Sequence, residues 1–459
     1  MTKYILSGQA LTRAYKEGSL TPLQVCTQLW QRLKQYNPEV NAFSYLAEEE
    51  SLEMAKASSL RWQQGKALSS IDGWPISIKD SFWVRGWPMH AGANIKTETS
   101  SDEDAPVVQH LRLAGAVLFA KTTMPQWGWK GATDSPVTGI TRNPWDLNKT
   151  CGGSSGGAAV AVSLGLGVVA IGTDGGGSIR IPGAFCGVIG YKPTHDLFPR
   201  YPLHNLAQLV DVGVLARDIA DIETLLPILN QDDMRAVNYV SLPKVKQKES
   251  YKLSYSLAFG FAQLDSEVAA IFERSIAALR KHHFALEEKT PPVGDYLSAF
   301  AHIWQAGYYE SYTSLTSAEQ LQLEPGLTRI AKLGITMPLL DYLQAETTRL
   351  SVSEAMQRFF RSYDALLTPT VPIPAFDVGL DSPNAQSTSV LDNWTPFTCL
   401  FNMTGQPSIT VPCGLTSQGL PVGLQISGPK LSDRQLLTLS QKIAAVLQFD
   451  TLPPLINPV

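Results

Sequence analysis

Two serine-bearing glycine segments stand close together in the chain, and their residues are the best suited to chemistry. The first reads GGSSGG at 152–157, and the second reads GTDGGGSIRI at 172–181, with an apolar run between them. Glycine loses more backbone freedom on folding than other residues, so such loops indicate a backbone that must approach something closely. A serine in such a loop is a candidate nucleophile once a neighbouring group removes its proton.

The stretch PISIKD at 75–80 supplies a candidate base in Lys79. A lone lysine at the end of a strand usually points into solvent, where its pKa is ~10.4 and it stays charged. Burial disfavours the charged form and lowers that pKa by up to roughly 3–5 units. Because neither glycine segment contains a histidine, a buried and neutral Lys79 is the base that the neighbouring serines favour.

Other chemistries that use glycine loops fit less well. Neither segment has the lysine of a phosphate-binding GxxxxGK[ST] loop, and GLGVVA at 165–170 leads from a helical stretch into a strand, the reverse of a dinucleotide-binding turn. GGSSG also matches the GxSxG elbow of α/β-hydrolase esterases around Ser154. The preceding RNPWDLNKT is polar and turn-forming where that elbow needs a strand, so the esterase stays as an alternative.

Composition and charge exclude several other classes. The 459 residues are 44% hydrophobic and 17% charged, and the net charge is only −4, which indicates a globular protein without a basic face for nucleic acid. No apolar run is long enough to predict a membrane span, and no signal-peptide pattern stands at the N-terminus. Five scattered cysteines are typical of a reducing cytoplasm, and seven histidines without an HExxH or HxH pattern predict no metal site.

The elements that must position these residues alternate between helix and strand. Residues 1–70 show helical spacing of apolar residues, and Thr21 before Pro22 is a typical helix start. A further helix is predicted at 266–281, behind Asp265 as its cap. Apolar runs of strand length stand at 74–80, 116–121, 167–173, 365–373 and 407–414. This alternation predicts an α/β fold with a largely parallel sheet.

Taken together, these segments resemble the amidase signature family over nearly the whole chain. Besides the serine segments and PISIKD, the matching blocks are NPEVNAF (37–43), DAPVVQHLRLAGAVLFAKTTMPQW (104–127), TGITRNPWD (138–146), FCGVIGYKPT (185–194), LLTPTVPIPAF (366–376), NMTGQPSITVP (402–412) and GLPVGLQISG (419–428). The resemblance implies an α/β amidase signature fold, with a large mixed, mostly parallel β-sheet surrounded by α-helices. It also implies a single domain, 1–459, with a helical N-terminal region (1–70), a core (74–195) and a more variable helical region (265–350).

The resemblance implies hydrolysis of a carboxylic amide by a Ser–cis-Ser–Lys triad and a covalent acyl-enzyme. Carried over by position, Ser178 would be the nucleophile, Ser154 the bridging serine and Lys79 the base. The family's bridging serine follows a cis peptide bond, which we expect at Gly153–Ser154. Ser154 would pass a proton from the nucleophile to the lysine and later to the leaving nitrogen. No metal or organic cofactor is implied.

The second glycine segment would then surround the oxygen that becomes negative during attack. Its expected backbone donors are Gly175, Gly176, Gly177 and Ser178, and they converge only if no side chains intervene. Asp174 and Arg180 flank these donors and are expected to brace the loop as an ion pair. Ser155 beside the bridge is expected to tune hydrogen bonding only.

Three positions depart from the family's usual residues. Ser81 stands where asparagine is common, Cys151 where proline is common, and Gly175 where a bulkier residue is common. None of them removes a member of the triad. Cys151 is interpreted as a small buried filler rather than a thiol nucleophile.

The substrate pocket is less well defined by the sequence. Met124, Gln126 and Trp127 follow the strand at 116–121, and the resemblance puts them near the acyl pocket. Five tryptophans would suit an aromatic pocket, although burial in the core is the simpler explanation for them: Trp127, Trp129, Trp145, Trp304 and Trp394. The stretch 290–350 is expected to shape the entrance.

An alternative within the family is the amidase subunit of a tRNA-dependent amidotransferase, which works with partner subunits. Those proteins usually carry GSDTGGS where this chain has GTDGGGS, so the sequence is closer to the free-standing amidases. We therefore expect a small-molecule amide substrate, no nucleic-acid or membrane partner, and a cytoplasmic monomer or homodimer.

Overall fold

The computed structural model describes residues 6–95, 100–202, 205–235, 238, 240–244, 248, 250–384 and 394–456. Its helices are α1 (Gly8–Glu17), α2 (Pro22–Val40), α3 (Glu48–Gln63), α4 (Pro106–Leu113), η2 (Gln126–Gly128, a 3-10 turn), α5 (Gly156–Ser163), α6 (Arg180–Phe185), α7 (Ile219–Leu229), α8 (Ser266–Lys281), α9 (Leu297–Thr313), α10 (Ser317–Gln320), α11 (Pro325–Ile335), α12 (Leu339–Phe359), α13 (Pro396–Thr404) and α14 (Asp433–Leu447).

The strands lie between these helices along the chain. They are β1 (Phe43–Leu46), β2 (Pro75–Lys79), β3 (Val117–Thr122), β4 (Asp134–Ser135), β5 (Gly139–Ile140), β6 (Arg142–Asn143), β7 (Asp146–Thr150), β8 (Val169–Asp174), β9 (Ile189–Lys192), β10 (Asp211–Ala216), β11 (Lys252–Tyr255), β12 (Ala285–Glu288), β13 (Ala365–Pro369), β14 (Ser408–Leu415) and β15 (Pro421–Ser427).

Local sequence signals predicted several of these elements well. Thr21 caps α2 through its side chain, with Pro22 in the first turn, and Asp265 caps α8 at the predicted residues. The side-chain oxygens of these caps accept hydrogen bonds from backbone N–H groups that the first helical turn leaves unpaired. The five predicted strands correspond to β2, β3, β8, β13 and β14, while the N-terminal 70 residues are helical except for β1.

One eleven-stranded sheet crosses the molecule, in the order β1-β3-β2-β8-β10-β9-β14-β15-β13-β11-β12. It is mixed, as predicted, but it is not mostly parallel. Among the described strands, the pairs β2–β3, β2–β8, β11–β13 and β11–β12 are parallel and the other neighbouring pairs are antiparallel. Helix α4 joins the parallel pair β2–β3, and helix α8 joins β11–β12, whereas β9–β10 and β14–β15 are joined without a helix and run antiparallel.

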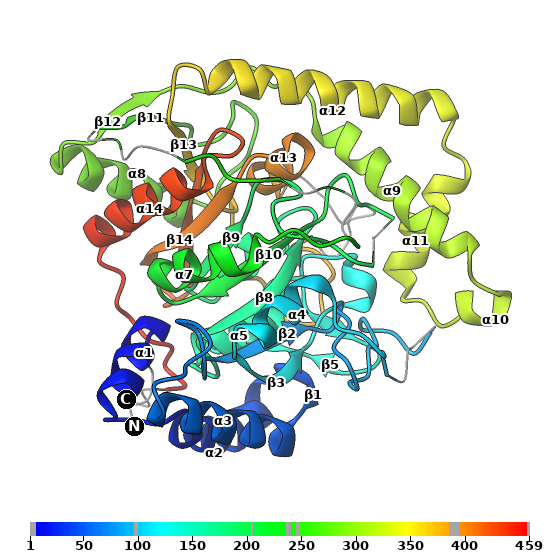
Figure 1. Ribbon diagram of the computed structural model, residues 1–459. Coiled ribbons are helices and arrows are strands. Elements are labelled where there is room, and N and C mark those ends of the chain that lie inside the picture. The colour runs from blue at the N-terminus through cyan, green and yellow to red at the C-terminus, as the bar shows by residue number, and fades with distance from the viewer. Residues whose placement is uncertain are drawn as a thin grey trace.

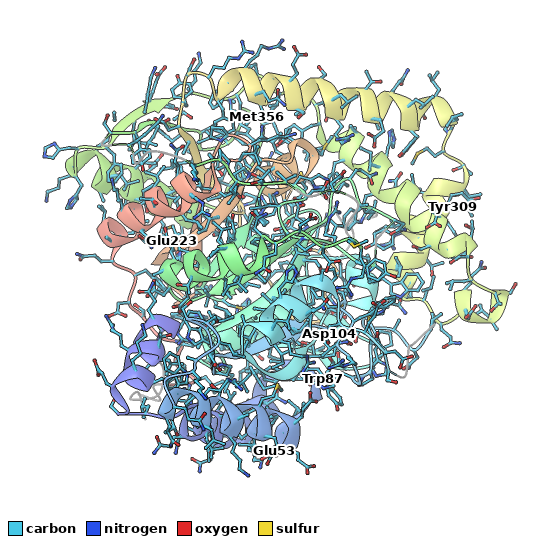
Figure 2. The ribbon with its side chains drawn as sticks, in the orientation of Figure 1. Glu53, Trp87, Asp104, Glu223, Tyr309 and Met356 are labelled. Carbon is cyan, nitrogen blue, oxygen red and sulfur yellow. The ribbon has the colours of Figure 1, made fainter. Side chains whose placement is uncertain are left out.

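Helices cover the sheet and divide the apolar interior into several clusters (Figure 1). The largest cluster lies between the sheet and α1, α4, α7, α8 and α14, and a second lies under α2 and α5. A third joins α9, α11, α12 and α13, the helices at the upper right of Figure 1. Met356 points from α12 into that third cluster, whereas Glu53 of α3 lies on the outer surface (Figure 2).

Candidate active site

Lys79 and the second glycine segment meet because β2 and β8 are parallel neighbours. The register pairs Ile78 with Ile171, so both strands end at the same edge of the sheet. Lys79 is the last residue of β2 and Asp174 the last of β8. As a result, Lys79 Nζ lies 2.8 Å from Thr173 Oγ1 and 2.7 Å from Ser154 Oγ.

The first glycine segment is a loop between β7 and α5, which corrects the prediction for the residues before it. RNPWDLNKT forms the hairpin β6–β7 instead of an irregular turn. Its polar composition suits a small two-stranded sheet that lies partly in solvent, outside the main sheet. The Gly153–Ser154 peptide bond in the following loop is cis, as predicted, and the Ser154 side chain is almost fully buried.

The surroundings of Lys79 differ from those of the other buried lysines. Four lysines are buried in the described part of the chain: Lys79, Lys121, Lys130 and Lys192. Lys121 lies 2.8 Å from Asp80, Lys192 lies 2.9 Å from Asp211, and Lys130 contacts three carboxylates. Within the described residues, no carboxylate lies within ion-pair distance of Lys79, which has hydroxyl partners instead.

This environment changes the protonation of Lys79. Burial lowers the pKa of its amine to about 7, partly opposed by the negative charge of Asp174. Burial has this direction because the ammonium ion loses its hydration while the neutral amine loses little. At neutral pH a large fraction of Lys79 is therefore uncharged and able to accept a proton.

Asp174 holds the second glycine segment in shape. Its carboxylate accepts hydrogen bonds from the backbone N–H groups of Gly177 and Ile179, at 2.7 and 3.1 Å. Arg180 lies 2.9 Å from the same carboxylate, and both side chains are fully buried, so the expected ion pair is present. Burial alone would raise the pKa of Asp174, but the Arg180 charge and these hydrogen bonds hold it below its usual range.

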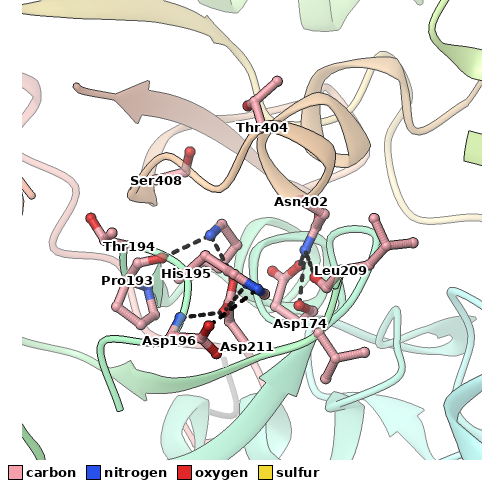
Figure 3. Close-up of polar contacts among 12 residues, drawn as sticks. Asp174, Pro193, Thr194, His195, Asp196, Leu209, Asp211, Asn402, Thr404 and Ser408 are labelled. Atoms are coloured by element: carbon pink, nitrogen blue, oxygen red, sulfur yellow. Dashed lines mark hydrogen bonds and ion pairs between the residues drawn. The ribbon is translucent and has the colours of Figure 1, made fainter. Parts of the chain in front are cut away.

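A wider polar network supports this brace from β10 and α13 (Figure 3). Asn402 Nδ2 donates to the backbone and side chain of Asp174, at 2.8 and 2.9 Å, and to the Leu209 carbonyl at 3.1 Å. Asp211, which pairs with Asp174 in the sheet, accepts from Lys192 and lies 2.9 Å from the His195 ring. The end of β8 is therefore fixed from several elements.

One of the four expected oxyanion donors is committed elsewhere. Gly177 N–H donates to Asp174 within the loop, so it does not face a substrate. Gly177 has a φ of 124°, a backbone conformation that favours glycine, and its role is to turn the chain beneath the carboxylate. The correction leaves Gly175, Gly176 and Ser178 as the candidate backbone donors.

Ser155 and Cys151 have structural contacts. Ser155 Oγ donates to the Thr173 carbonyl at 3.0 Å, and its N–H donates to the Ser178 carbonyl at 3.0 Å, so it joins the two glycine segments. Cys151 is fully buried, and burial raises the pKa of its thiol to about 12. A thiol with that pKa stays protonated at neutral pH and is a poor nucleophile.

Both serines open onto one cavity of about 710 Å³. The described residues that line it are Ser81, Phe82, Met89, Ala91, Met124, Trp127, Gly128, Ser154, Thr173, Gly175, Ser178, Arg200, Tyr201, Pro202, Asn205, Val210, Val212, Trp304, Tyr308, Glu310 and Ser311. The second half of α9 provides four of these residues, so part of the 290–350 stretch lies at the cavity. The walls are mainly apolar and aromatic, with the hydroxyl groups gathered at one end of two strands.

Met124 and Trp127 line this cavity, but Gln126 does not, which corrects its assignment to the substrate pocket. Its Oε1 accepts from Glu324 N–H at 2.8 Å, and its Nε2 donates to the Gln322 carbonyl. Gln126 therefore ties η2 to the start of α11. Of the five tryptophans, Trp127 and Trp304 line the cavity, whereas the other three are buried outside it.

Sequence reasoning missed two groups that contact the candidate catalytic residues. Thr173 hydrogen-bonds to Lys79, and its position inside the GTDGGGS motif was a signal for it. Asn402 binds Asp174 from 228 positions away, and only its place in the NMTGQP block pointed to it.

Further searches of the described residues support no metal or esterase site. No group of three or more His, Cys, Asp or Glu side chains is arranged to hold a metal ion there. No histidine is among the described residues that line the cavity, so the GxSxG alternative lacks its base. None of the helices in the described ranges has the length and hydropathy needed to cross a membrane.

Comparison with known proteins agrees with this geometry. The family model Amidase matches residues 24–437, and the chain therefore belongs to that family, whose members hydrolyse amide C–N bonds. An acylamidase of Rhodococcus erythropolis is 32% identical, with 96% of this chain and 95% of that protein covered. The amidase-type subunit of a glutamyl-tRNA(Gln) amidotransferase from Symbiobacterium thermophilum is also 32% identical, with 95% and 96% covered.

Solved structures show the same architecture. A 6-aminohexanoate cyclic dimer hydrolase with bound substrate superposes with a TM-score of 0.88 at 25% identity, over 99% of this chain and 100% of the other. A crystal structure of an amidase gives 0.85 at 28% identity, over 96% and 99%. The mixed sheet surrounded by helices is thus the amidase signature fold.

Proposed function

We propose that this chain is a free-standing hydrolase of small carboxylic amides that works through an acyl-enzyme on Ser178. The observation that carries the proposal is Lys79, a buried amine without a carboxylate partner, 2.7 Å from Ser154 Oγ. Ser154 and Ser178 line the same cavity, so a proton has a short route from one to the other. A pKa of about 7 provides the neutral base that this route needs.

In the first half of the reaction, Ser178 Oγ forms a bond to the amide carbonyl carbon. The Ser178 proton passes to Ser154, whose own proton passes to neutral Lys79, which becomes an ammonium group. The carbonyl oxygen carries the resulting negative charge, which the N–H groups of Gly175, Gly176 and Ser178 stabilise. The C–N bond then breaks as Ser154 returns a proton to the leaving nitrogen and is reprotonated by Lys79.

In the second half, water replaces the amine. Neutral Lys79, acting through Ser154, removes a proton from a water molecule that attacks the ester carbonyl of the acyl-enzyme. The ester C–O bond breaks, Ser178 Oγ recovers its proton by the same route, and the carboxylic acid leaves. One amide and one water therefore yield one acid and one amine or ammonia, with no external oxidant or cofactor.

The matched pair of variants Ser178→Ala and Ser163→Ala tests this assignment. Ser163 is another buried serine, on α5, and it does not line the cavity. With a panel of simple amides and anilides, Ser178→Ala should lower kcat/KM by at least about 10³-fold, because it removes the nucleophile. Ser163→Ala should stay near wild type, and retained activity in Ser178→Ala would reject the assignment.

The amidase component of a tRNA-dependent amidotransferase is the second candidate, favoured by the 32% identity to such a protein. Glutamine would bring an α-carboxylate and an α-ammonium group into the cavity. Arg200 and Glu310 are the charged side chains among its described lining residues, and Arg200 already donates to the Val210 carbonyl and pairs with Asp196. The apolar walls and the GTDGGGS motif therefore support the free-standing enzyme.

Assays on the isolated chain separate the two candidates. A free-standing amidase should release amine or ammonia from simple amides and anilides without any added protein. An amidotransferase component should instead hydrolyse glutamine, and only strongly when its partner proteins are present. Glutamine turnover together with inert simple amides would favour the amidotransferase component.

A further inference from the structure

Three aromatic side chains on α9 form a continuous ladder beside the candidate nucleophile. Phe300, Trp304 and Tyr308 are spaced four residues apart, so they share one face of the helix. The Phe300 and Trp304 rings are stacked with centroids 5.5 Å apart, and the Trp304 and Tyr308 rings meet edge to face at 5.3 Å. Trp304 and Tyr308 both line the cavity.

This ladder packs directly on the glycine loop because that loop lacks side chains. A Cβ at Gly175 would lie 3.3 Å from Trp304 Cζ3 and 2.9 Å from Val210 Cγ2. A Cβ at Gly176 would lie 2.9 Å from Phe300 Cζ. Gly175 is also the position where the sequence departs from the bulkier residue common in the family, and the six-membered ring of Trp304 occupies the space beside it.

The two sides of the cavity have different parts in the reaction proposed above, on which this inference rests. The leaving nitrogen takes its proton through Ser154, so the amine lies on the Ser154 side, where a Cβ at Gly128 would be 3.1 Å from Ser154 Oγ and 3.7 Å from Met124 Cε. The acyl group stays attached to Ser178, next to Gly175. The wall that contacts the acyl group is therefore Trp304, with Val210.

Trp304 also has an unused hydrogen-bond donor. Its Nε1 is buried and has no acceptor among the described residues. A buried indole N–H usually has a partner, so an acceptor on a ligand in the adjoining cavity would complete it. The side chain thus offers a flat face and one donor.

We propose that Trp304 is a specificity-determining residue that selects amides of flat, aromatic carboxylic acids, above all those whose ring bears a hydrogen-bond acceptor. An aryl group conjugated with the amide is planar and stacks on the indole, which adds attraction beyond the burial of apolar area. A saturated ring of similar size is thicker and lacks this contact. The acceptor on the ring, such as a pyridine nitrogen, takes the indole N–H.

Primary amides test this selection with the smallest leaving group. Benzamide, cyclohexanecarboxamide and the three pyridinecarboxamide isomers are compared by ammonia release. Trp304→Leu should reduce the ratio of kcat/KM for benzamide over cyclohexanecarboxamide by about 3- to 10-fold, because the stacking face is lost. Trp304→Phe should keep that ratio within about 2-fold but remove any advantage of the best pyridine isomer over benzamide.

Two further variants separate selection from general damage. Trp62→Leu makes the same exchange at a half-buried tryptophan outside the cavity, and it should leave the ratio unchanged. Gly175→Ala adds the Cβ that would press on Trp304, so it should lower the ratio whatever it does to the absolute rate. Intrinsic reactivity of the substrates cancels when ratios are compared between wild type and variants.

Binding provides the outcome that separates this inference from the proposed function. Ser178→Ala protein, with and without Trp304→Leu, is titrated with benzamide and cyclohexanecarboxamide by calorimetry. A preference for benzamide that depends on Trp304 supports the inference even if wild type turns over no amide, which would defeat only the hydrolase proposal. Turnover with an unchanged ratio in both Trp304→Leu and Gly175→Ala would overturn the inference and leave the hydrolase proposal standing.

Discussion

At the scale of single residues, the partners of a buried lysine decide what it can do. Lys121 and Lys192 each face a carboxylate, and such pairs keep a lysine charged and structural. Lys79 faces two hydroxyl groups, and burial therefore lowers its pKa to about 7. The four buried lysines of the described chain thus include one suited to general-base chemistry.

The pH dependence of catalysis follows from this pKa. Lys79 accepts a proton only when it is neutral, so kcat/KM should rise with pH and level off above an apparent pKa near 7. The measurement is kcat/KM for an uncharged primary amide between pH 5 and 9. A profile that stays flat through pH 7, or rises only near pH 10, would contradict the role of Lys79 as base.

At the scale of elements, the unit β8–loop–α6 depends on one buried carboxylate. Asp174 ends β8 and receives N–H groups from the loop, while Arg180 at the start of α6 balances its charge. Breaking a buried ion pair from one side typically costs about 3–5 kcal/mol, since the remaining charge has no partner. The geometry of Ser178 depends on the same contacts.

Asp174→Asn should therefore harm both folding and catalysis. The change leaves the Arg180 charge unbalanced and turns an amide NH₂ group toward N–H donors. We expect a large fall in Tm and a loss of at least about 100-fold in kcat/KM, as when an oxyanion donor is displaced. In whatever activity remains, the pH limb should move to lower pH, because the Asp174 charge raises the pKa of Lys79.

Asp72→Asn is the matched control for this change. Asp72 is also buried and pairs with Arg61 at 2.6 Å, but neither residue lines the cavity. The control should lower Tm while leaving kcat/KM of the folded enzyme near wild type. If Asp174→Asn behaves in the same way, the brace has no part in shaping the catalytic loop.

At the scale of the whole molecule, sequence predicted what neighbouring residues determine. Caps and apolar periodicity located α2, α8 and the strands β2 and β8, because these signals act within a few residues. Strand direction was wrong for most neighbouring pairs, since it depends on how distant segments dock. The assignment of Gln126 failed for the same reason, because its partner Gln322 lies 196 positions further along.

The candidate site divides along the same line. The motif positions of Lys79, Ser154 and Asp174 could be identified in advance, and the structure brings Lys79 to Ser154 as expected. The aromatic wall from α9 was harder to predict, because a tryptophan in a helix gives no sign of which cavity it faces. Trp304 contacts the glycine loop only because α9 packs across it.

A buried lysine without a counter-charge also affects the stability of the whole fold. Its folded pKa of about 7 lies below the value of ~10.4 for an unfolded lysine. Between these two values the unfolded chain binds one more proton than the folded chain, so stability rises with pH across that window, by about 1.4 kcal/mol per pH unit. The destabilisation is largest at and below pH 7.

Lys79→Met removes this dependence and should show it in a comparison of Tm at pH 7, 8 and 9. The Tm of the variant relative to wild type should be highest at pH 7 and fall as pH rises, because only wild type gains stability with pH. Lys130→Met is the reference: burial alone would lower the pKa of Lys130, but its carboxylate partners raise it above the usual lysine value. The stabilisation from Lys130 is fully present throughout this pH range, so Lys130→Met should be less stable than wild type by a constant amount. A Lys79→Met difference that is equally constant would mean that Lys79 is charged in the folded protein, and the proposed base would be lost with it.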